Sequence, residues 1–210
     1  MSLIGQVGEL MGELMKRTPW GEISLQPLIN DIANVGPEFV RFLQNGGRVI
    51  VHQTVFPIWR TATLGRHPTP EVYLASIEGG GRKISRWARG IASKVTCSQQ
   101  EIELPLVDVS GEDLGFTQVY TYAEFIERTA TFGLYPCPAE TGLALADQFD
   151  DQPAGDYRRI AMEAIAVSDG CLSVFCVFHD EGGLRLLTNS GHPAYQWNPE
   201  LRWVLTTRKP

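Results

Sequence analysis

The residue best placed to act as a nucleophile is Cys137, which lies between Pro136 and Pro138 just before a predicted helix. A helix N-terminus lowers the pKa of a thiol and so favours the reactive thiolate. A cysteine hydrolase also needs a histidine within hydrogen-bond reach of that thiol. The sequence selects none of the three candidates, His52, His179 and His192. The alternative interpretation is that the prolines fix the chain, Cys137 packs in the core and Glu140 caps the helix.

A second candidate site is basic. Five side chains cluster on and before another predicted helix: Arg82, Lys83, Arg86, Arg89 and Lys94. A preceding helix and the Gly79-Gly80-Gly81 turn give segment 70–94 the outline of a helix-turn-helix. Arg82, Arg86 and Arg89 share one face at helical spacing, and such a face suits contacts to phosphate. The pattern predicts nucleic-acid or anion binding, with a solvated helix face as the alternative.

Aromatic residues near the C-terminus offer a third candidate. Tyr195 and Trp197 follow His192-Pro193 and precede Pro199, so we expect them in a loop. Exposed aromatic rings are favoured anchors for protein partners. The pair therefore indicates a partner-binding surface, and packing in the core of a small sheet is the alternative.

Metal and cofactor chemistry find no support in the spacing of ligand-type residues. The four cysteines, at positions 97, 137, 171 and 176, fit no zinc pattern. The glycine triplet before Arg82 lacks the spacing of a phosphate-binding loop. The paired carboxylates at 101/103, 112/113 and 150/151 fall on one strand face or in turns rather than in a common cleft. We therefore expect no metal site and no cofactor.

Composition excludes several classes of protein. The chain has 210 residues, of which 43% are hydrophobic, and a net charge of −6. No apolar run approaches the roughly 20 residues of a membrane-spanning helix, so we expect no membrane association. The charge is uneven, because residues 41–94 carry +7 and residues 95–210 carry −10. This asymmetry indicates either cross-neutralisation in the folded protein or an anion-binding face. Free cysteines without a secretory signal favour the cytoplasm.

The elements that must position these residues follow from periodicity and caps. Helices are predicted to begin at Pro70 and after Ser85, and to span 120–132 and 138–149. Strand patterns cover 48–53, 59–64, 101–109, 159–167, 172–179, 184–187 and 202–206. Residues 3–16 have helical apolar spacing, which predicts either a helix docked on its own core or a helix for self-association.

The fold class that these elements predict is α+β. We expect an N-terminal helical region over 1–45 and a mixed part with the basic helix pair over 46–150. An antiparallel sheet subdomain, a small β-meander, is expected over 151–210. The alternative is that the three parts form one domain, since the boundary near residue 150 rests only on a turn-rich stretch.

Several stretches resemble an uncharacterised group of bacterial hypothetical proteins that is common in candidate-phylum (Patescibacteria) genomes. The matching segments include residues 59–65, 84–88 and 133–142. The most distinctive are Cys-Pro-Ala-Glu at 137–140 and Asp-Gln-Pro at 151–153. The resemblance covers roughly residues 55–170. It implies an ordered domain over that span and implies no activity, cofactor or catalytic residue.

The leading prediction from these observations is a non-enzymatic binding or regulatory protein that acts through protein–protein interaction. Its partner is another protein or, through residues 3–16, a second copy of the chain. Nucleic-acid binding through segment 70–94 and a cysteine-dependent hydrolase at Cys137 are the alternatives.

Overall fold

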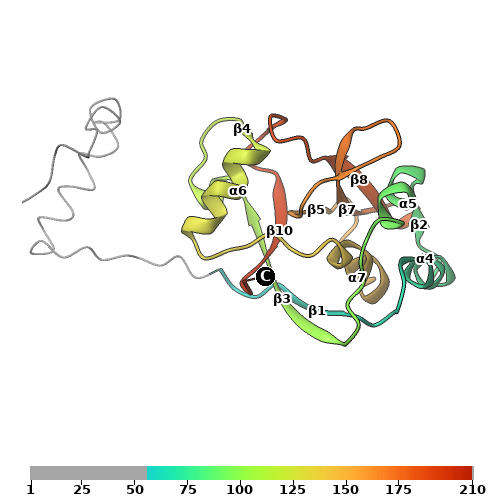
Figure 1. Cartoon of the computed structure of the whole chain (residues 1–210). Coiled ribbons are helices and arrows are strands. Elements are labelled where there is room, and N and C mark those ends of the chain that lie inside the picture. The colour runs from blue at the N-terminus through green and yellow to red at the C-terminus, as the bar shows by residue number, and fades with distance from the viewer. Residues whose placement is uncertain (1–55, 210) are drawn as a thin grey trace, which may run out of the picture. The chain divides into compact units, whose positions relative to one another are not determined.

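A mixed β-sheet dominates the part of the chain that the computed structural model describes, residues 56–209, which belong to the unit Gln53–Pro210 (Figure 1). Its strands follow the order β1-β3-β10-β5-β7-β8-β2, with β6 beside β7. Their bounds are β1 Arg60–Leu64, β2 Lys83–Ile84, β3 Ile102–Ser110, β5 Tyr157–Ile160, β6 Ile165–Ala166, β7 Leu172–Asp180, β8 Gly183–Ser190 and β10 Arg202–Thr206. The expected helical region 1–45, with its segment 3–16, the strand at 48–53 and His52 lie outside the described residues.

The sheet confirms the α+β class and corrects the expected C-terminal meander. Hairpins at residues 168–170 and 181–182 do join β6, β7 and β8 in antiparallel pairs. However, β10 pairs with β5 in parallel and with β3 antiparallel, so it lies between strands from both predicted parts. A meander would require neighbours in sequence to be neighbours in space, and here long-range pairing overrides that order.

Four helices of the described region flank this sheet: α4 Pro70–Gly79, α5 Arg86–Ala92, α6 Tyr122–Thr131 and α7 Glu140–Gln148. Their starts are set locally, because Pro70 occupies the first turn of α4 and the Ser85 hydroxyl accepts a hydrogen bond from Ala88 N. Thr121 and Glu124 form a reciprocal capping box on α6. None of these helices is long and apolar enough to cross a membrane.

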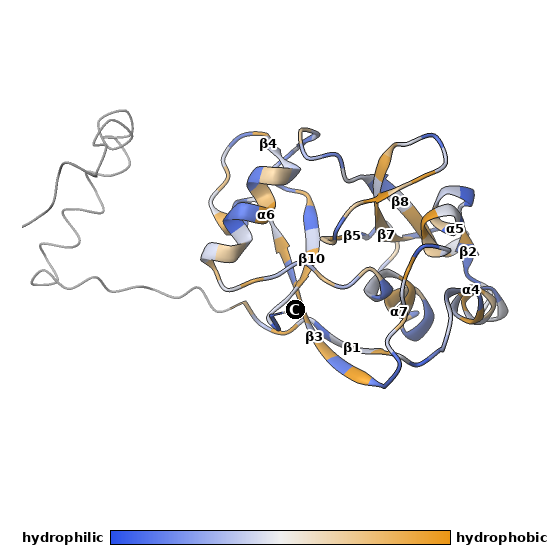
Figure 2. Cartoon of the chain, viewed as in Figure 1, coloured by the Kyte–Doolittle hydropathy of each residue, from blue (hydrophilic) through white to orange (hydrophobic). Residues whose placement is uncertain are grey.

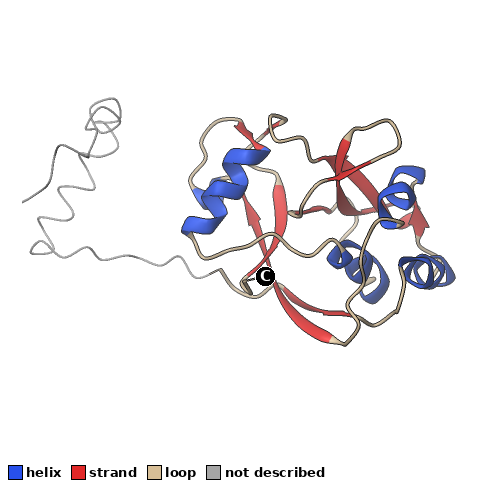
Figure 3. Cartoon of the chain, viewed as in Figure 1, coloured by secondary structure: helices blue, strands red, loops and turns tan. Residues whose placement is uncertain are grey.

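The two faces of the sheet are covered by different helices (Figure 3). Trp203, Arg159 and Cys176 are register partners across β10, β5 and β7 and so share one face. On that face Trp203 stacks against Tyr122 of α6, with 5.2 Å between ring centroids. The opposite face carries Phe175, against which α7 packs at Gly142. Figure 2 shows the matching alternation of apolar and polar residues along β3.

Gly142 lets α7 approach the sheet closely. A Cβ atom at this position would lie 2.6 Å from Cβ of Phe175, well inside van der Waals contact. The absence of a side chain therefore sets the distance between helix and sheet.

One edge of the sheet, β1, is closed by a side chain of α7. Thr63 N donates to Oε1 of Gln148 at 2.9 Å, and Nε2 of Gln148 donates to the Thr63 carbonyl at 2.7 Å. The side-chain amide thus takes both backbone groups of Thr63, as a neighbouring strand would.

A short 3-10 turn and a two-stranded ribbon complete the description. The 3-10 turn η2, Glu112–Leu114, follows β3. The ribbon pairs β4 Tyr120–Thr121 with β9 Gln196–Trp197 in antiparallel register. Because β4 leads directly into α6, this ribbon holds the start of the helix against the loop that follows β8.

Candidate functional site

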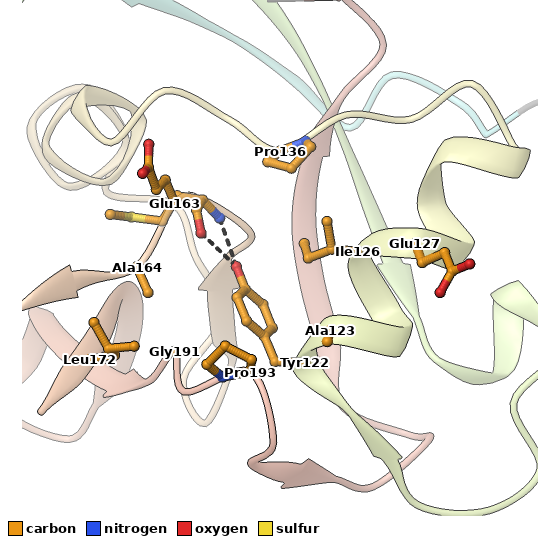
Figure 4. A pocket seen from close by; sticks show the side chains of 11 residues that line it. Tyr122, Ala123, Ile126, Glu127, Pro136, Glu163, Ala164, Leu172, Gly191 and Pro193 are labelled. Carbon is orange, nitrogen blue, oxygen red and sulfur yellow. Dashed lines mark hydrogen bonds between the residues drawn. The ribbon is translucent and has the colours of Figure 1, made fainter.

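An apolar pocket of about 660 Å³ opens between α6, the segment 162–164 and the loop after β8 (Figure 4). Its lining comes from five parts of the chain: Tyr122, Ala123, Ile126, Glu127, Pro136, Met162, Glu163, Ala164, Leu172, Gly191 and Pro193. The volume lies within the range of pockets that hold small ligands or side chains of a partner.

Tyr122 forms a rigid wall of this pocket. Its hydroxyl donates to the Met162 carbonyl at 2.7 Å and accepts from Met162 N at 3.0 Å. Burial raises the pKa of the Tyr122 phenol well above its usual range, so the phenol stays neutral. With both hydrogen-bonding capacities of the hydroxyl used, Tyr122 presents only its apolar ring to an occupant.

Two carboxylates lie on opposite sides of the pocket, Glu127 on α6 and Glu163 on the segment after β5 (Figure 4). Both residues are exposed, and neither forms an ion pair with another described residue. The pocket therefore combines an apolar floor with unpaired negative charge at its rim. This arrangement suits an apolar group that is flanked by cations.

A second hollow continues from the pocket across Pro136. It measures about 730 Å³, and Pro136, Glu163 and Ala164 line both. Lys94 and Cys137 are among its other lining residues. The two hollows are therefore adjacent and share part of their lining.

Cys137 is buried beside this surface, with 3% of its surface exposed. Its Sγ lies 3.7 Å from the Val204 carbonyl oxygen, and burial raises the pKa of the thiol well above its usual range. A protonated, enclosed thiol is a weak nucleophile.

The described histidines bond elsewhere than at Cys137. His67 contacts Asp147, His179 contacts the Gln152 carbonyl, and His192 accepts from Ala194 N. Within residues 56–209, the structure therefore brings no histidine bond to Cys137.

The basic residues of segment 82–94 are spread over separate contacts. Nη1 of Arg82 donates to the Asp147 carbonyl at 2.6 Å, Arg89 pairs with Glu78, and Nζ of Lys94 donates to the Ala166 carbonyl at 2.5 Å. Arg86 lies over the ring of Trp87 at 4.3 Å, and Lys83 is exposed.

The predicted helix-turn-helix outline is also altered. Strand β2, Lys83–Ile84, separates α4 from α5 and pairs in parallel with β8. The connection between the helices is therefore part of the sheet, which a glycine-rich turn does not reveal in the sequence.

The two aromatic residues near the C-terminus have different surroundings. Tyr195 is 48% exposed, whereas Trp197 is 6% exposed and stands edge-on to Trp203 at 5.1 Å. The Tyr195 ring packs on Trp197 with 4.8 Å between centroids. Tyr195 is thus available to a partner, and Trp197 belongs to the core.

A buried carboxylate at the start of α7 ties distant elements together. Oε1 of Glu140 accepts from Gly65 N at 2.6 Å and from the Tyr73 hydroxyl at 2.9 Å, and Oε2 accepts from Ser98 N at 2.8 Å. Only 1% of Glu140 is exposed. The sequence suggests a helix cap at this position, and its partners, 42 to 75 residues away, have no local signal.

Asp147 at the other end of α7 gathers Ser76 and His67. Its Oδ1 accepts from the Ser76 hydroxyl at 2.5 Å, and its Oδ2 lies 3.2 Å from Nε2 of His67. The carboxylate stands between the other two groups, whereas a nucleophilic serine needs the histidine as its immediate partner. Across residues 56–209, no group of three or more metal-ligating side chains assembles.

Comparisons with known proteins identify no relative of this chain. No protein-family model, no curated protein and no solved structure gives a significant match to the chain.

Proposed function

We propose that this protein binds a segment of a partner protein in the apolar pocket between α6 and residues 162–164. The recognised segment carries a bulky apolar residue with lysine or arginine on either side. The observation that carries the proposal is the unpaired Glu127 and Glu163 on opposite sides of an apolar floor. An apolar anchor in a pocket, with charges at the rim, is the usual anatomy of a protein interface.

The pocket favours a protein partner over nucleic acid or turnover. Two exposed carboxylates at the rim repel phosphate, while three of the basic side chains of segment 82–94 already bond within the protein. Cys137, the nucleophile that a hydrolase would use, is buried and protonated. Binding therefore fits the described residues better than either alternative.

Synthetic peptides test the proposal directly. Three peptides are titrated into the full chain: Leu-Trp-Leu flanked by lysines, the same core flanked by glutamates, and a serine core flanked by lysines. Binding is followed by methyl NMR signals of Ile126, Ala164 and Leu172, which line the pocket. We expect saturable shifts with the first peptide only, because it alone supplies both the anchor and the charges.

Two variants separate the floor from the rim. Ala164→Trp fills the pocket and should abolish binding. The double variant Glu127→Lys with Glu163→Lys should weaken the lysine-flanked peptide about tenfold, about 1.4 kcal/mol, and favour the glutamate-flanked one. The matched control is Glu112→Lys with Glu181→Lys, which changes the net charge equally at exposed residues outside the pocket lining. Equal binding of all three peptides, or equal weakening by both double variants, would contradict the proposal.

A further inference from the structure

Arg159 on β5 is buried without a partner. It is 9% exposed, and its Nε is sealed from solvent without a hydrogen bond. Among the described residues, no carboxylate forms an ion pair with its guanidinium. A buried donor without a hydrogen bond destabilises the folded protein, and more so when it is charged.

Other arginines of the described region that lie close to the sheet do have partners. Arg158 and Arg202 share Oδ2 of Asp108 at 2.8 and 2.9 Å, and Arg60 pairs with Asp151 at 2.8 Å. Arg159 is adjacent in sequence to Arg158 but points to the other face, because side chains alternate along a strand. Carboxylates therefore pair with Arg158 on one face of the sheet, whereas Arg159 on the other face has no carboxylate partner among the described residues.

Aromatic rings surround the Arg159 guanidinium. Its carbon lies 4.6 Å from the ring centre of Tyr157 and 5.1 Å from that of Trp197. These contacts favour a cation but satisfy none of its N–H groups. The Trp197 indole supplies a second unpaired donor, because its Nε1 is also sealed without a hydrogen-bond partner.

Tyr195 covers one side of this pair: its ring packs on Trp197 with 4.8 Å between centroids and is itself about half exposed. Burial lowers the pKa of Arg159, while Glu200 and the neighbouring phenols and thiol act in the opposite direction. Glu200 is exposed, and no ion pair of the described residues joins it to Arg159. Among the described residues, Glu200 is the carboxylate whose charge acts on this guanidinium.

We infer that Arg159 and Trp197 form a binding site for a small oxyanion, a carboxylate or a phosphate, beneath the Tyr195 ring. The Nε edge of a guanidinium presents parallel N–H donors that match two oxygens of such an anion. The indole N–H supplies a further donor, as neutral N–H groups do in many anion sites. This inference is independent of the pocket at α6.

Anion titration of the full chain provides the test. Sodium phosphate and sodium acetate are added in separate series at constant ionic strength, with sodium chloride as the reference. The Trp197 indole N–H signal, assigned with Trp197→Phe, should shift in a saturable way. The stronger of the two series then identifies phosphate or carboxylate as the preferred group.

Variants of Arg159 make the site specific. Arg159→Lys keeps the charge but loses the fork and should weaken binding at least tenfold, and Arg159→Met should abolish it. Arg185→Lys, at an arginine already paired with Asp180, should bind as the wild type does. Because Arg159→Lys retains a cation, it remains informative even if Arg159→Met does not fold.

Two results would overturn the inference. One is an indole shift that chloride reproduces or that Arg159→Lys leaves unchanged. The other is binding that appears in Glu200→Gln but not in the wild type, since that would identify Glu200 as the resident counterion.

Discussion

Two buried charges, one at each face of the sheet, have opposite surroundings. Glu140, on the α7 side, receives three hydrogen bonds from three separate segments. Arg159, on the α6 side, donates no hydrogen bond from its sealed Nε. A charge whose partners are complete holds the fold together, and one whose partners are missing is available to something outside the chain. The difference separates a structural group from a binding group without reference to any relative.

Asp108 stands between these extremes. Its Oδ2 meets both Arg158 and Arg202, while its Oδ1 is buried without a hydrogen bond. Glu140, Asp108 and Arg159 therefore form a series. The fewer hydrogen-bond and ion-pair partners the charged group has, the smaller is the expected loss in the free energy of unfolding when its charge is removed.

The largest effect is expected from Glu140→Gln. The amide has nearly the same shape, but its NH₂ group faces N–H and O–H donors and leaves some of them unsatisfied. We expect the free energy of unfolding, measured with urea, to fall by about 3 kcal/mol. Glu127→Gln on the exposed face of α6 is the control and should change stability by less than about 0.5 kcal/mol. Equal free energies of unfolding for the two variants would show that the hydrogen bonds of Glu140 do not stabilise the fold.

Gly142→Ala measures packing on the same helix without changing a charge. The new methyl group would overlap Phe175, so we expect a loss of about 2 kcal/mol. Gly90→Ala is the matched control, because a Cβ on α5 at that position meets nothing within 4 Å. That variant should stabilise the protein by about 0.5–1 kcal/mol through helix propensity. A stabilised Gly142→Ala would show that α7 can move away from the sheet.

Asp108→Asn should cost about 1 kcal/mol, because Arg158 keeps its ion pair with Asp156. Burial raises the pKa of Asp108 despite both arginines, so the folded protein binds this proton more tightly than the unfolded chain. The unfolding free energy of the wild type therefore falls as pH rises from about 4 through the raised pKa.

The pH dependence sharpens this intermediate case. Asparagine does not titrate, so the stability advantage of the wild type over Asp108→Asn should shrink with rising pH. Urea unfolding at several pH values measures it, with the exposed Asp150→Asn as the control. An advantage that grows with pH would mean that the arginines outweigh burial.

The smallest effect is expected from Arg159→Met. Replacing an unpaired buried charge with an apolar side chain of similar length removes a desolvation cost along with the contacts to two rings. We expect the free energy of unfolding in the absence of added anion to change by less than about 1 kcal/mol. If Arg159→Met lowers the free energy of unfolding as much as Glu140→Gln does, Arg159 stabilises the fold as Glu140 does, and the contrast between the two residues is wrong.

Local chemistry accounts for the elements that the sequence predicted. Pro70 and Ser85 begin helices as expected, and Gly133, with a φ of +68°, follows the end of α6. The strands at 59–64, 172–179 and 202–206 were visible as apolar, β-branched runs. Each of these signals depends on a few adjacent residues, which is why the sequence carries them.

Long-range pairing explains what the sequence did not predict. Nothing adjacent to residues 202–206 indicates that β10 lies between β3 and β5, since its partners are about 45 and 95 residues away. The pocket likewise draws its lining from residues between Tyr122 and Pro193. Arg159 looked like one basic residue of an alternating strand, and only its buried position and missing partner distinguish it.

The side-chain amide of Gln148 has a consequence for how molecules of this protein meet. An uncovered edge strand offers free N–H and C=O groups to any other chain, and aggregation often begins there. At the middle of β1, Gln148 already occupies both groups of Thr63. An arriving strand would have to displace α7's last residue before it could add to this edge. A single glutamine thereby discourages the sheet from growing from one molecule into the next.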